Sequence, residues 1–211
     1  SRRNFIELCH VLTAEDEQAF EALFRRLGLS VDWAQNYATI DERCQRVSQR
    51  AFLRNLARSE AYQIEAPTLW DVTHRTAVAQ AELEDRERPG AYHTLVFHRT
   101  DGGGDLQIAT TRPELVVSCV ALVAHPDDER YRHLIGKRAI LPIMGRRIPI
   151  IADQSVDVEF GPGALKVTPG HDGDDFEIGQ RHDLETINVM NPEGTMNENA
   201  GPFQGQDRME C

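Results

Sequence analysis

The sequence predicts an α+β protein in which a β-rich, barrel-like core follows a helical segment. Apolar side chains recur at three- and four-residue spacing in the first third of the 211 residues. From about residue 92 the chain changes to short β-rich runs separated by turn signals. Several short strands at close spacing are typical of a barrel or a folded-over sheet. We therefore expect a helical connecting segment, residues 1–90, and a β-rich core, residues 91–211.

Two helices are expected in the connecting segment. Thr13 and Asp16 have the spacing of a capping box, which would begin a helix that runs to Gly28. A second helix is expected from Asp41 to about Tyr62. The run PTLWDV after it is expected to be extended.

Seven runs of the core have the composition of strands, and turn-forming residues separate them. They are YHTLVFH, DLQIATT, CVALVAH, KRAILPI, RRIPIIA, GALKVT and TINVM. One helix is expected within DDFEIGQRH, because Asp174 and Asp175 favour a first helical turn and Arg181 and His182 favour a last one.

Composition narrows the function classes. The net charge of −11 opposes broad, nonspecific binding to nucleic acid, which needs clustered Lys and Arg. The four cysteines include no C-x-x-C pair, so neither a zinc site nor a disulfide framework is expected, and no cofactor is predicted. No apolar run reaches the ~18 residues of a membrane span, and no signal peptide is evident. We expect a cytoplasmic protein, a monomer by default, and a fragment of a larger chain.

The stretch GPGALKVTPGHDGDDFEIG, residues 161–179, places four carboxylates beside Lys166, Thr168 and His171. A solvated surface loop would have this composition, and so would a polar pocket for a small charged substrate. Other chemistries have weaker support. The chain has no G-x-S-x-G, H-E-x-x-H or P-loop pattern, and Cys119 is expected to be buried and inert.

The run IATTRPEL, residues 108–115, brings two threonines and an arginine to the end of an expected strand. Pro113 biases Arg112 toward an extended conformation and stops the strand, which would expose the hydroxyls of Thr110 and Thr111. Alone, this run would indicate a plain strand-to-turn transition. Its combination with KVTPGHDGDDF favours a functional site.

Five runs resemble the editing domain of valyl-tRNA synthetases, which is inserted in the catalytic domain of these class I enzymes. They are ATTRPE, HPDDERYRHLIGK, GRRIPIIAD, EFGPGALKVTPGHDGDDFEIGQRH and INVMNPEGTMNENAGPF. The resemblance covers most of the chain and implies a short-stranded, barrel-like editing domain with peripheral helices after a helical linker. The chain departs from the family at Pro162, at Gly170 and in the run LVVSC, residues 115–119. It lacks the H-x-G-H and K-M-S-K-S signatures, so amino-acid activation is not expected.

The resemblance implies hydrolysis of threonyl-tRNA(Val), with the threonine-bearing 3′ end of tRNA(Val) and the remainder of the synthetase as partners. Threonine is nearly isosteric with valine, and an apolar pocket cannot strongly reject the added hydroxyl. A second, polar pocket that selects this hydroxyl would therefore be needed. The rival interpretations are a tRNA-binding appendage with a decayed editing site and a purely structural insertion.

The resemblance also implies roles for single residues. Asp175 would bind the substrate's α-ammonium, and Asp172 and Lys166 would recognise the threonine hydroxyl. The other expected site residues would hold the tRNA 3′ end and the attacking water, shape the pocket, or form its wall: Thr110, Thr111, Arg112, Phe160, Thr168 and His171. His171 is equally compatible with a structural role. No general base is evident, so positioning of the water is expected to be the main catalytic effect, with help from the terminal hydroxyl of the tRNA.

Overall fold

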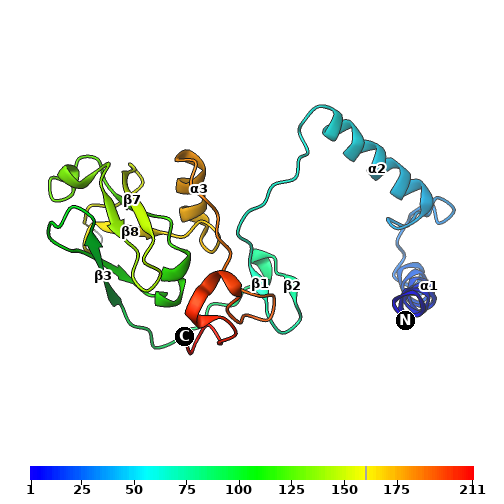
Figure 1. The fold of residues 1–211 in the computed structure, drawn as a ribbon. Helices are drawn as coiled ribbons and strands as arrows, with labels where there is room; N and C mark the ends of the chain where they lie inside the picture. The colour runs from blue at the N-terminus through cyan, green and yellow to red at the C-terminus, as the bar shows by residue number, and fades with distance from the viewer. Residues whose placement is uncertain (160) are drawn as a thin grey trace. The chain divides into compact units, whose positions relative to one another are not determined.

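A computed structural model describes residues 1–159 and 161–211, so Phe160 lies outside the described residues. The chain forms two compact units, Ser1–Gln63 and Ile64–Cys211 (Figure 1). The expected functional division between residues 90 and 91 stays a prediction.

The first unit consists of two helices, α1 (Arg2–Arg26) and α2 (Glu42–Ala57). Helix α1 begins after the cap Ser1, whose side chain accepts a hydrogen bond from the Asn4 amide, so the expected start at Thr13 was wrong. The Thr13 hydroxyl instead donates to the carbonyl of Cys9 within the helix, a bond that lets threonine occupy a helix interior. Helix α2 begins as expected after the cap Asp41, which accepts from the Cys44 amide at 2.7 Å, but it ends at Ala57, short of the expected end near Tyr62.

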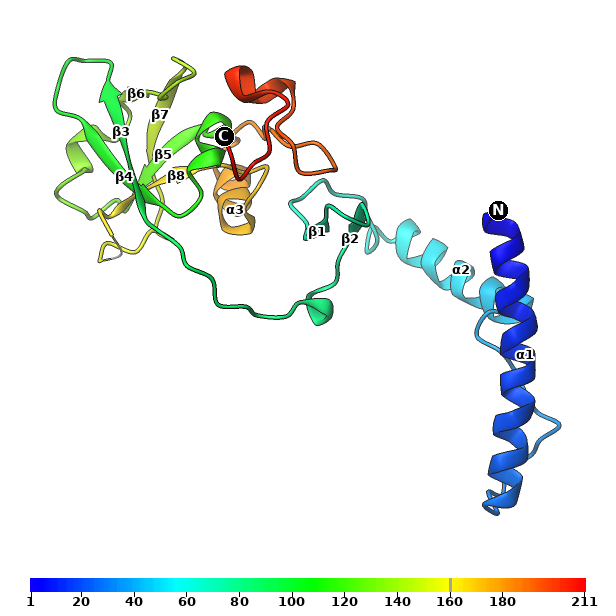
Figure 2. The ribbon, with the colours of Figure 1, turned by 90° about the horizontal axis from the view of Figure 1, so that it is seen from below.

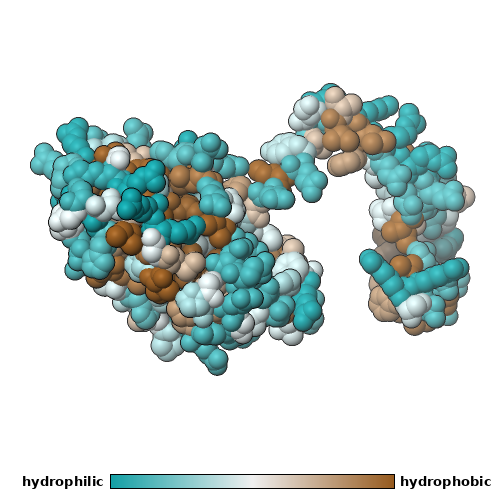
Figure 3. Space-filling view, in the orientation of Figure 1, coloured by the Kyte–Doolittle hydropathy of each residue, from teal (hydrophilic) through white to brown (hydrophobic). Residues whose placement is uncertain are grey.

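Neither of these helices contains a buried residue. The stripe expected to pack α1 is exposed, with Phe20 at 59% and Leu27 at 68% of their full accessibility. Figure 3 shows apolar side chains on the visible surface of this unit. The contacts of these helices are local ones, such as end caps, the i,i+4 ion pair Arg25–Glu21 at 2.7 Å and the stacking of Arg25 over the Trp33 ring.

The second unit is built on a six-stranded sheet that curls into a nearly closed barrel (Figure 2). Its strands are β3 (His93–Arg99), β4 (Leu106–Thr110), β5 (Ala121–Ala124), β6 (Arg138–Ile140), β7 (Arg147–Ala152) and β8 (Ala164–Val167). The order is β4-β3-β6-β7-β5-β8, with β5 and β7 parallel and the other pairs antiparallel. The edge strands β4 and β8 also contact each other. The predicted α+β, barrel-like class is confirmed.

The interior of the barrel explains why these segments form strands. β5 is buried at all four positions because it lies between β7 and β8, which requires an uninterrupted apolar run. A 3₁₀ helix, Pro113–Ser118, follows β4 and buries Leu115 to Ser118. Cys119 is fully buried, and burial raises the pKa of its thiol to about 11, as expected for an inert cysteine.

Smaller elements complete the unit. They are the hairpin β1 (Trp70–Asp71) and β2 (Thr76–Ala77), the 3₁₀ turns Gln80–Glu82, Arg132–Leu134 and Glu198–Phe203, and helix α3 (Gly173–Arg181). Among the residues that the structure describes, no helix is both long and apolar enough to cross a bilayer.

The run TINVM was expected to be a strand, and this was wrong. Only Met190 forms an isolated bridge, with Met196. Side chains bond the backbone of this segment: the Val189 amide donates to His171, and the Asn188 carbonyl accepts from Asn197 and Asn199. These bonds satisfy the polar groups that a strand ladder would otherwise pair.

Candidate active site

The candidate site lies where β8 leads into α3. Asp172 caps α3, and its Oδ1 accepts from the amides of Asp174 and Asp175 at 3.0 and 3.2 Å. A carboxylate in this position satisfies helix amides that would otherwise lack partners. The cap therefore fixes the first turn of α3 and, with it, the position of Asp175.

Asp175 is fastened to the end of β8 through Thr168. Its Oδ2 accepts from the Thr168 amide at 2.8 Å and from the Thr168 hydroxyl at 2.9 Å. The other oxygen of Asp175, Oδ1, makes no hydrogen bond within the described residues. Lys166 Nζ donates to the same Thr168 hydroxyl at 3.3 Å, so the fully buried Thr168 links the two charged side chains.

Burial dominates the electrostatics of this group. It raises the pKa of Asp175, against the opposing effect of the Thr168 hydrogen bonds and of Lys166. It also lowers the pKa of Lys166, against the attraction of Asp175. Each charged form therefore lacks part of its hydration, and a ligand of complementary charge would interact strongly here.

Lys166, Asp172 and Asp175 line a pocket of about 460 Å³, which we call the acidic pocket. The structure brings four of the expected site residues together in its lining: Thr110, Lys166, Asp172 and Asp175. The remaining lining residues are Ala109, Ser155, Leu165, Asp174, Glu177, Ile178 and Arg181. Four carboxylates face two cationic side chains, a balance that favours a positively charged group such as an ammonium.

Arg112 and His171 line a different pocket, of about 910 Å³, which we call the arginine pocket. Arg112 Nη1 donates to the carbonyl of His171 at 3.0 Å, and its Nε lies 3.5 Å from Glu114. The Arg112 amide donates to the Thr110 hydroxyl at 3.1 Å. The end of β4 is thus tied to the loop before α3.

His171 is held as a neutral imidazole. Its Nε2 lies 3.0 Å from the Val189 amide and accepts its hydrogen, which assigns the proton of the neutral ring to Nδ1. Burial lowers the pKa of His171 to about 4, and the positive charges of Arg112 and Lys166 lower it further. An imidazole with its acceptor nitrogen already bonded is poorly suited to take a proton from water.

Two expected site residues lie apart from both pockets. Thr111 is exposed, and it lines neither pocket. Thr168 lies behind Lys166 and Asp175 and reaches the acidic pocket only through them. The expected role of Phe160 falls outside the described residues.

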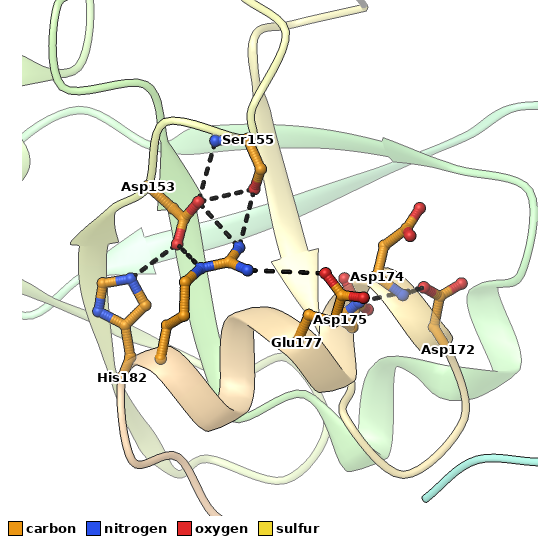
Figure 4. A network of polar contacts seen from close by, with 8 residues as sticks. Asp153, Ser155, Asp172, Asp174, Asp175, Glu177 and His182 are labelled. Atoms are coloured by element: carbon orange, nitrogen blue, oxygen red, sulfur yellow. Dashed lines mark hydrogen bonds and ion pairs between the residues drawn. The ribbon is translucent and has the colours of Figure 1, made fainter.

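Sequence reasoning missed a polar cluster at the other end of α3 (Figure 4). Asp153 is buried and accepts from Arg181 Nε and Nη2, both at 3.0 Å, and from the Ser155 hydroxyl at 2.7 Å. His182 Nε2 lies 2.9 Å from Asp153 Oδ2. Burial would raise the pKa of Asp153, but the hydrogen bonds from Arg181, Ser155 and His182 hold it well below its usual range. The sequence marked only Arg181 and His182, as the basic end of α3. Asp153 lies 28 residues before Arg181, and no local pattern predicts that the two side chains meet.

Two of the three departures from the family pattern, Pro162 and Gly170, have contacts that explain their local setting. The Pro162 carbonyl accepts from the Tyr131 hydroxyl at 2.6 Å, which anchors the loop before β8. A Cβ at Gly170 would lie only 2.5 Å from the Ile187 carbonyl oxygen. Gly170 therefore permits the close approach that brings Val189 to His171.

No group of three or more His, Cys, Asp or Glu side chains in residues 1–159 and 161–211 is arranged to hold a metal ion.

Comparison with known proteins identifies the family. The model of the family described as tRNA synthetases class I (I, L, M and V) matches residues 1–178. A valine–tRNA ligase of Thermobifida fusca is 57% identical over 210 residues, which is 100% of this chain and 24% of that protein. A valine–tRNA ligase of Salinispora tropica is 57% identical over 196 residues, 93% of this chain and 23% of that protein. The chain thus spans about a quarter of the length of these relatives.

One solved structure is also similar, at a lower level. It is the ternary complex of Agrobacterium radiobacter K84 agnB2 LeuRS with tRNA and LeuAMS, at 16% identity and a TM-score of 0.41, covering 84% of this chain and 32% of that one.

Proposed function

The chain belongs to the class I tRNA synthetases, and from this premise we propose that its barrel unit is an editing module that hydrolyses mischarged threonyl-tRNA(Val). The partners are then the 3′ end of tRNA(Val) and the rest of a valine–tRNA ligase. A cytoplasmic, monomeric parent enzyme is part of the same proposal.

The observation that carries this proposal is the fixed carboxylate of Asp175. Thr168 occupies its Oδ2 with two hydrogen bonds and leaves Oδ1 for a ligand. Since the side chain is half-buried, an α-ammonium would form a charge-assisted hydrogen bond with it. An esterified amino acid keeps a free ammonium, which this carboxylate would bind.

Selection of threonine over valine needs polar groups that a valine side chain would leave unsatisfied. Lys166 and the second oxygen of Asp172 are the donor and acceptor in the acidic pocket that suit a hydroxyl. A ligand without the hydroxyl would leave these groups desolvated and unpaired. That asymmetry is the physical basis of the proposed selectivity.

Catalysis then rests on positioning a water and stabilising the developing oxyanion. Thr110 lines the pocket and would help to place the water, and Lys166 is the cation available to the oxyanion. Asp175 bound to an ammonium would be a poor base, and the acceptor nitrogen of His171 is engaged. The terminal hydroxyl of the tRNA is the remaining group that would assist the proton transfer.

Deacylation of threonyl-tRNA(Val) by the chain, with valyl-tRNA(Val) as the paired substrate, tests the proposal. We expect loss of threonine at a rate well above that of valine, and near-background rates for Asp175→Ala. Equal rates for the two esters would refute the selectivity. Stability of both esters with the chain and with the parent synthetase would favour a tRNA-binding appendage with a decayed site.

A further inference from the structure

Helix α3 is anchored at both of its ends, and the proposed chemistry uses only the first anchor. At its start, Asp175 Oδ2 accepts from the amide and the hydroxyl of Thr168 at 2.8 and 2.9 Å. At its end, Arg181 donates to Asp153 through Nε and Nη2, both at 3.0 Å. Figure 4 shows Asp153 and Asp175 at opposite ends of the helix. The anchors belong to the ends of β7 and β8, which β5 separates in the sheet, so α3 connects strands that are not neighbours.

The second anchor is itself held firmly by the barrel. Asp153 is buried, and its amide donates to the carbonyl of Ala124 at the end of β5, 3.1 Å away. Its Oδ1 also accepts from the Ser155 amide at 2.9 Å. Because the two nitrogens of Arg181 bond different oxygens of this carboxylate, they fix the orientation of the arginine as well as its distance.

The middle of α3 has a single buried apolar side chain, Ile178, which packs in a small cluster with Val123, Val156 and Val167. Asp175 and Arg181 lie three residues before and after it, about 4.5 Å along the helix axis in each direction. A rotation of α3 about Ile178 would therefore displace both ends by similar amounts in opposite directions. Restraining Arg181 restrains Asp175.

The first anchor cannot fix this axis by itself. Both Thr168 bonds go to one oxygen of Asp175, so they hold a point and leave the helix free to turn about it. Lys166 stands on β8, whereas Asp172 and Asp175 stand at the start of α3. The axis of α3 therefore sets how the cationic and anionic sides of the acidic pocket face each other.

The same helix forms a wall of the acidic pocket. Asp175, Ile178 and Arg181 line this pocket, whereas Phe176 and Gln180 lie on the other face of α3 and line the arginine pocket. A tilt of α3 would reshape the lining along its whole length. The guanidinium of Arg181 is engaged by Asp153, so its role is to hold the wall rather than to bind a ligand.

We propose that Arg181 is a positioning residue of the editing site. Its paired bonds to Asp153 fix the axis of α3, and this axis keeps the carboxylates of α3 in place opposite Lys166 on β8. The assignment rests on the proposed editing function and adds to it a residue that touches neither the ester nor the attacking water.

The first test measures kcat and KM for deacylation of threonyl-tRNA(Val) by the chain, at a temperature where circular dichroism shows every variant folded. Arg181→Ala is expected to lower kcat about tenfold, because a displaced carboxylate no longer orients the ester. KM should stay within about twofold of the parent value, since Arg181 has no assigned contact with the substrate. Arg147→Ala is the matched control: Arg147 is exposed and lines neither pocket, so both constants should be unchanged.

A double-mutant cycle separates positioning from stability. In an Asp175→Asn background the ammonium contact that Arg181 positions is already lost, so adding Arg181→Ala should lower kcat by less than about threefold. The fall in melting temperature should be the same in both backgrounds, because the bonds to Asp153 are lost in each. An arginine that only stabilised the fold would show no such interaction in kcat.

Arg181→Lys keeps the test informative if the alanine variant does not fold. Lysine retains a positive charge beside the buried Asp153 but makes a single-point contact in place of the paired one. Its kcat should therefore lie between the values of the parent chain and of Arg181→Ala.

The Thr168 amide reports on the same coupling without catalysis, because it donates to Asp175 at the start of α3. We expect its NMR resonance to move in Arg181→Ala and to stay in place in Arg147→Ala. A chain that moves this resonance but hydrolyses neither ester refutes the editing function alone. Three results refute the positioning role alone: an unmoved Thr168 resonance, the parent kcat in folded Arg181→Ala, or an undiminished loss of kcat in the Asp175→Asn background.

Discussion

The acidic pocket holds four carboxylates around a half-buried lysine, whereas the arginine pocket, on the other face of α3, holds two arginines and an exposed tryptophan. Net charge therefore describes the surface as a whole and does not fix the charge of a single pocket. In a chain of charge −11, a group of carboxylates and a pair of arginines line separate pockets on the two faces of one helix. Substitutions that affect one pocket and spare the other would establish this division.

Asp175→Asn is expected to have the largest effect and to act on the acidic pocket alone. Asparagine can still accept both Thr168 hydrogen bonds, so the fold should persist, but the charge that binds an ammonium is lost. A charge-assisted bond contributes about 1.5–3 kcal/mol, which predicts a ten- to hundredfold slower deacylation of threonyl-tRNA(Val).

The melting temperature of Asp175→Asn should stay close to that of the parent chain, because both Thr168 hydrogen bonds are kept. The control is Glu185→Gln, which removes an exposed carboxylate that lines neither pocket and should deacylate normally. Equally slow deacylation by Glu185→Gln would show that the rate follows net charge rather than the Asp175 carboxylate.

Gly170→Ala is expected to disturb both pockets. The added Cβ would press on the Ile187 carbonyl at 2.5 Å and push the segment at Val189 away from His171. Such overpacking costs about 1–3 kcal/mol, measurable by urea denaturation. Gly173→Ala is the matched control: a Cβ there meets nothing within 4 Å, and alanine gains up to about 1 kcal/mol of helix propensity in α3. Equal stabilities of the two variants would contradict the close-approach argument.

The folded barrel unit should lose stability as the pH falls from 6.5 towards 4. His171 has its pKa lowered from 6.5 to about 4 by burial, so the unfolded chain takes up a proton in this interval that the folded chain refuses. The stability is fully present above the unfolded pKa and is lost as the pH falls through the folded pKa. After allowance for solvent screening, we expect about 1–2 kcal/mol, a shift of a few degrees in melting temperature.

Melting temperatures of the parent chain and of His171→Gln between pH 7 and pH 4.5 check this expectation. The variant should show a flatter dependence, because glutamine takes up no proton. Parallel curves for the two proteins would assign the pH dependence to other groups.

Ser155→Ala is expected to have the smallest effect, and only on stability. It removes one hydroxyl from Asp153 and Arg181, while the paired bonds between these two side chains remain. We expect a loss of about 0.5–1.5 kcal/mol by chemical denaturation. A loss far above this range would mean that the Asp153 cluster depends on Ser155 rather than on Arg181.

The sequence was sufficient for the strands and for part of the acidic pocket. Six of the seven expected strands formed because their apolar positions meet in one core, and a resemblance along KVTPGHDGDDF pointed to Lys166, Asp172 and Asp175, which the structure brings into one lining. The cap at Asp172 was also visible in principle, since an aspartate three residues before another acidic residue is typical of a helix start.

The rest depends on contacts between distant positions. The Trp70 indole donates a hydrogen bond to the Pro192 carbonyl, 122 residues away, and no local sequence pattern predicts this contact. The strand TINVM failed because hydrogen bonds from distant side chains replace a strand ladder. The start of α1 was misplaced because Ser1 supplies an earlier cap and Thr13 bonds back to the Cys9 carbonyl within the helix. The residue roles assigned by resemblance stay predictions until the variants are measured.

The capping bonds of Asp172 have a consequence for mutational genetics. Any substitution that removes its carboxylate also loosens the turn that presents Asp175, so a loss of activity at position 172 does not by itself identify a substrate contact. Combined with Asp175→Asn, such a substitution should cost less than the sum of the two single losses. Asp172→Asn, which keeps an acceptor oxygen for the cap, and Asp172→Ala, which does not, would show how much of the phenotype belongs to helix architecture and how much to recognition.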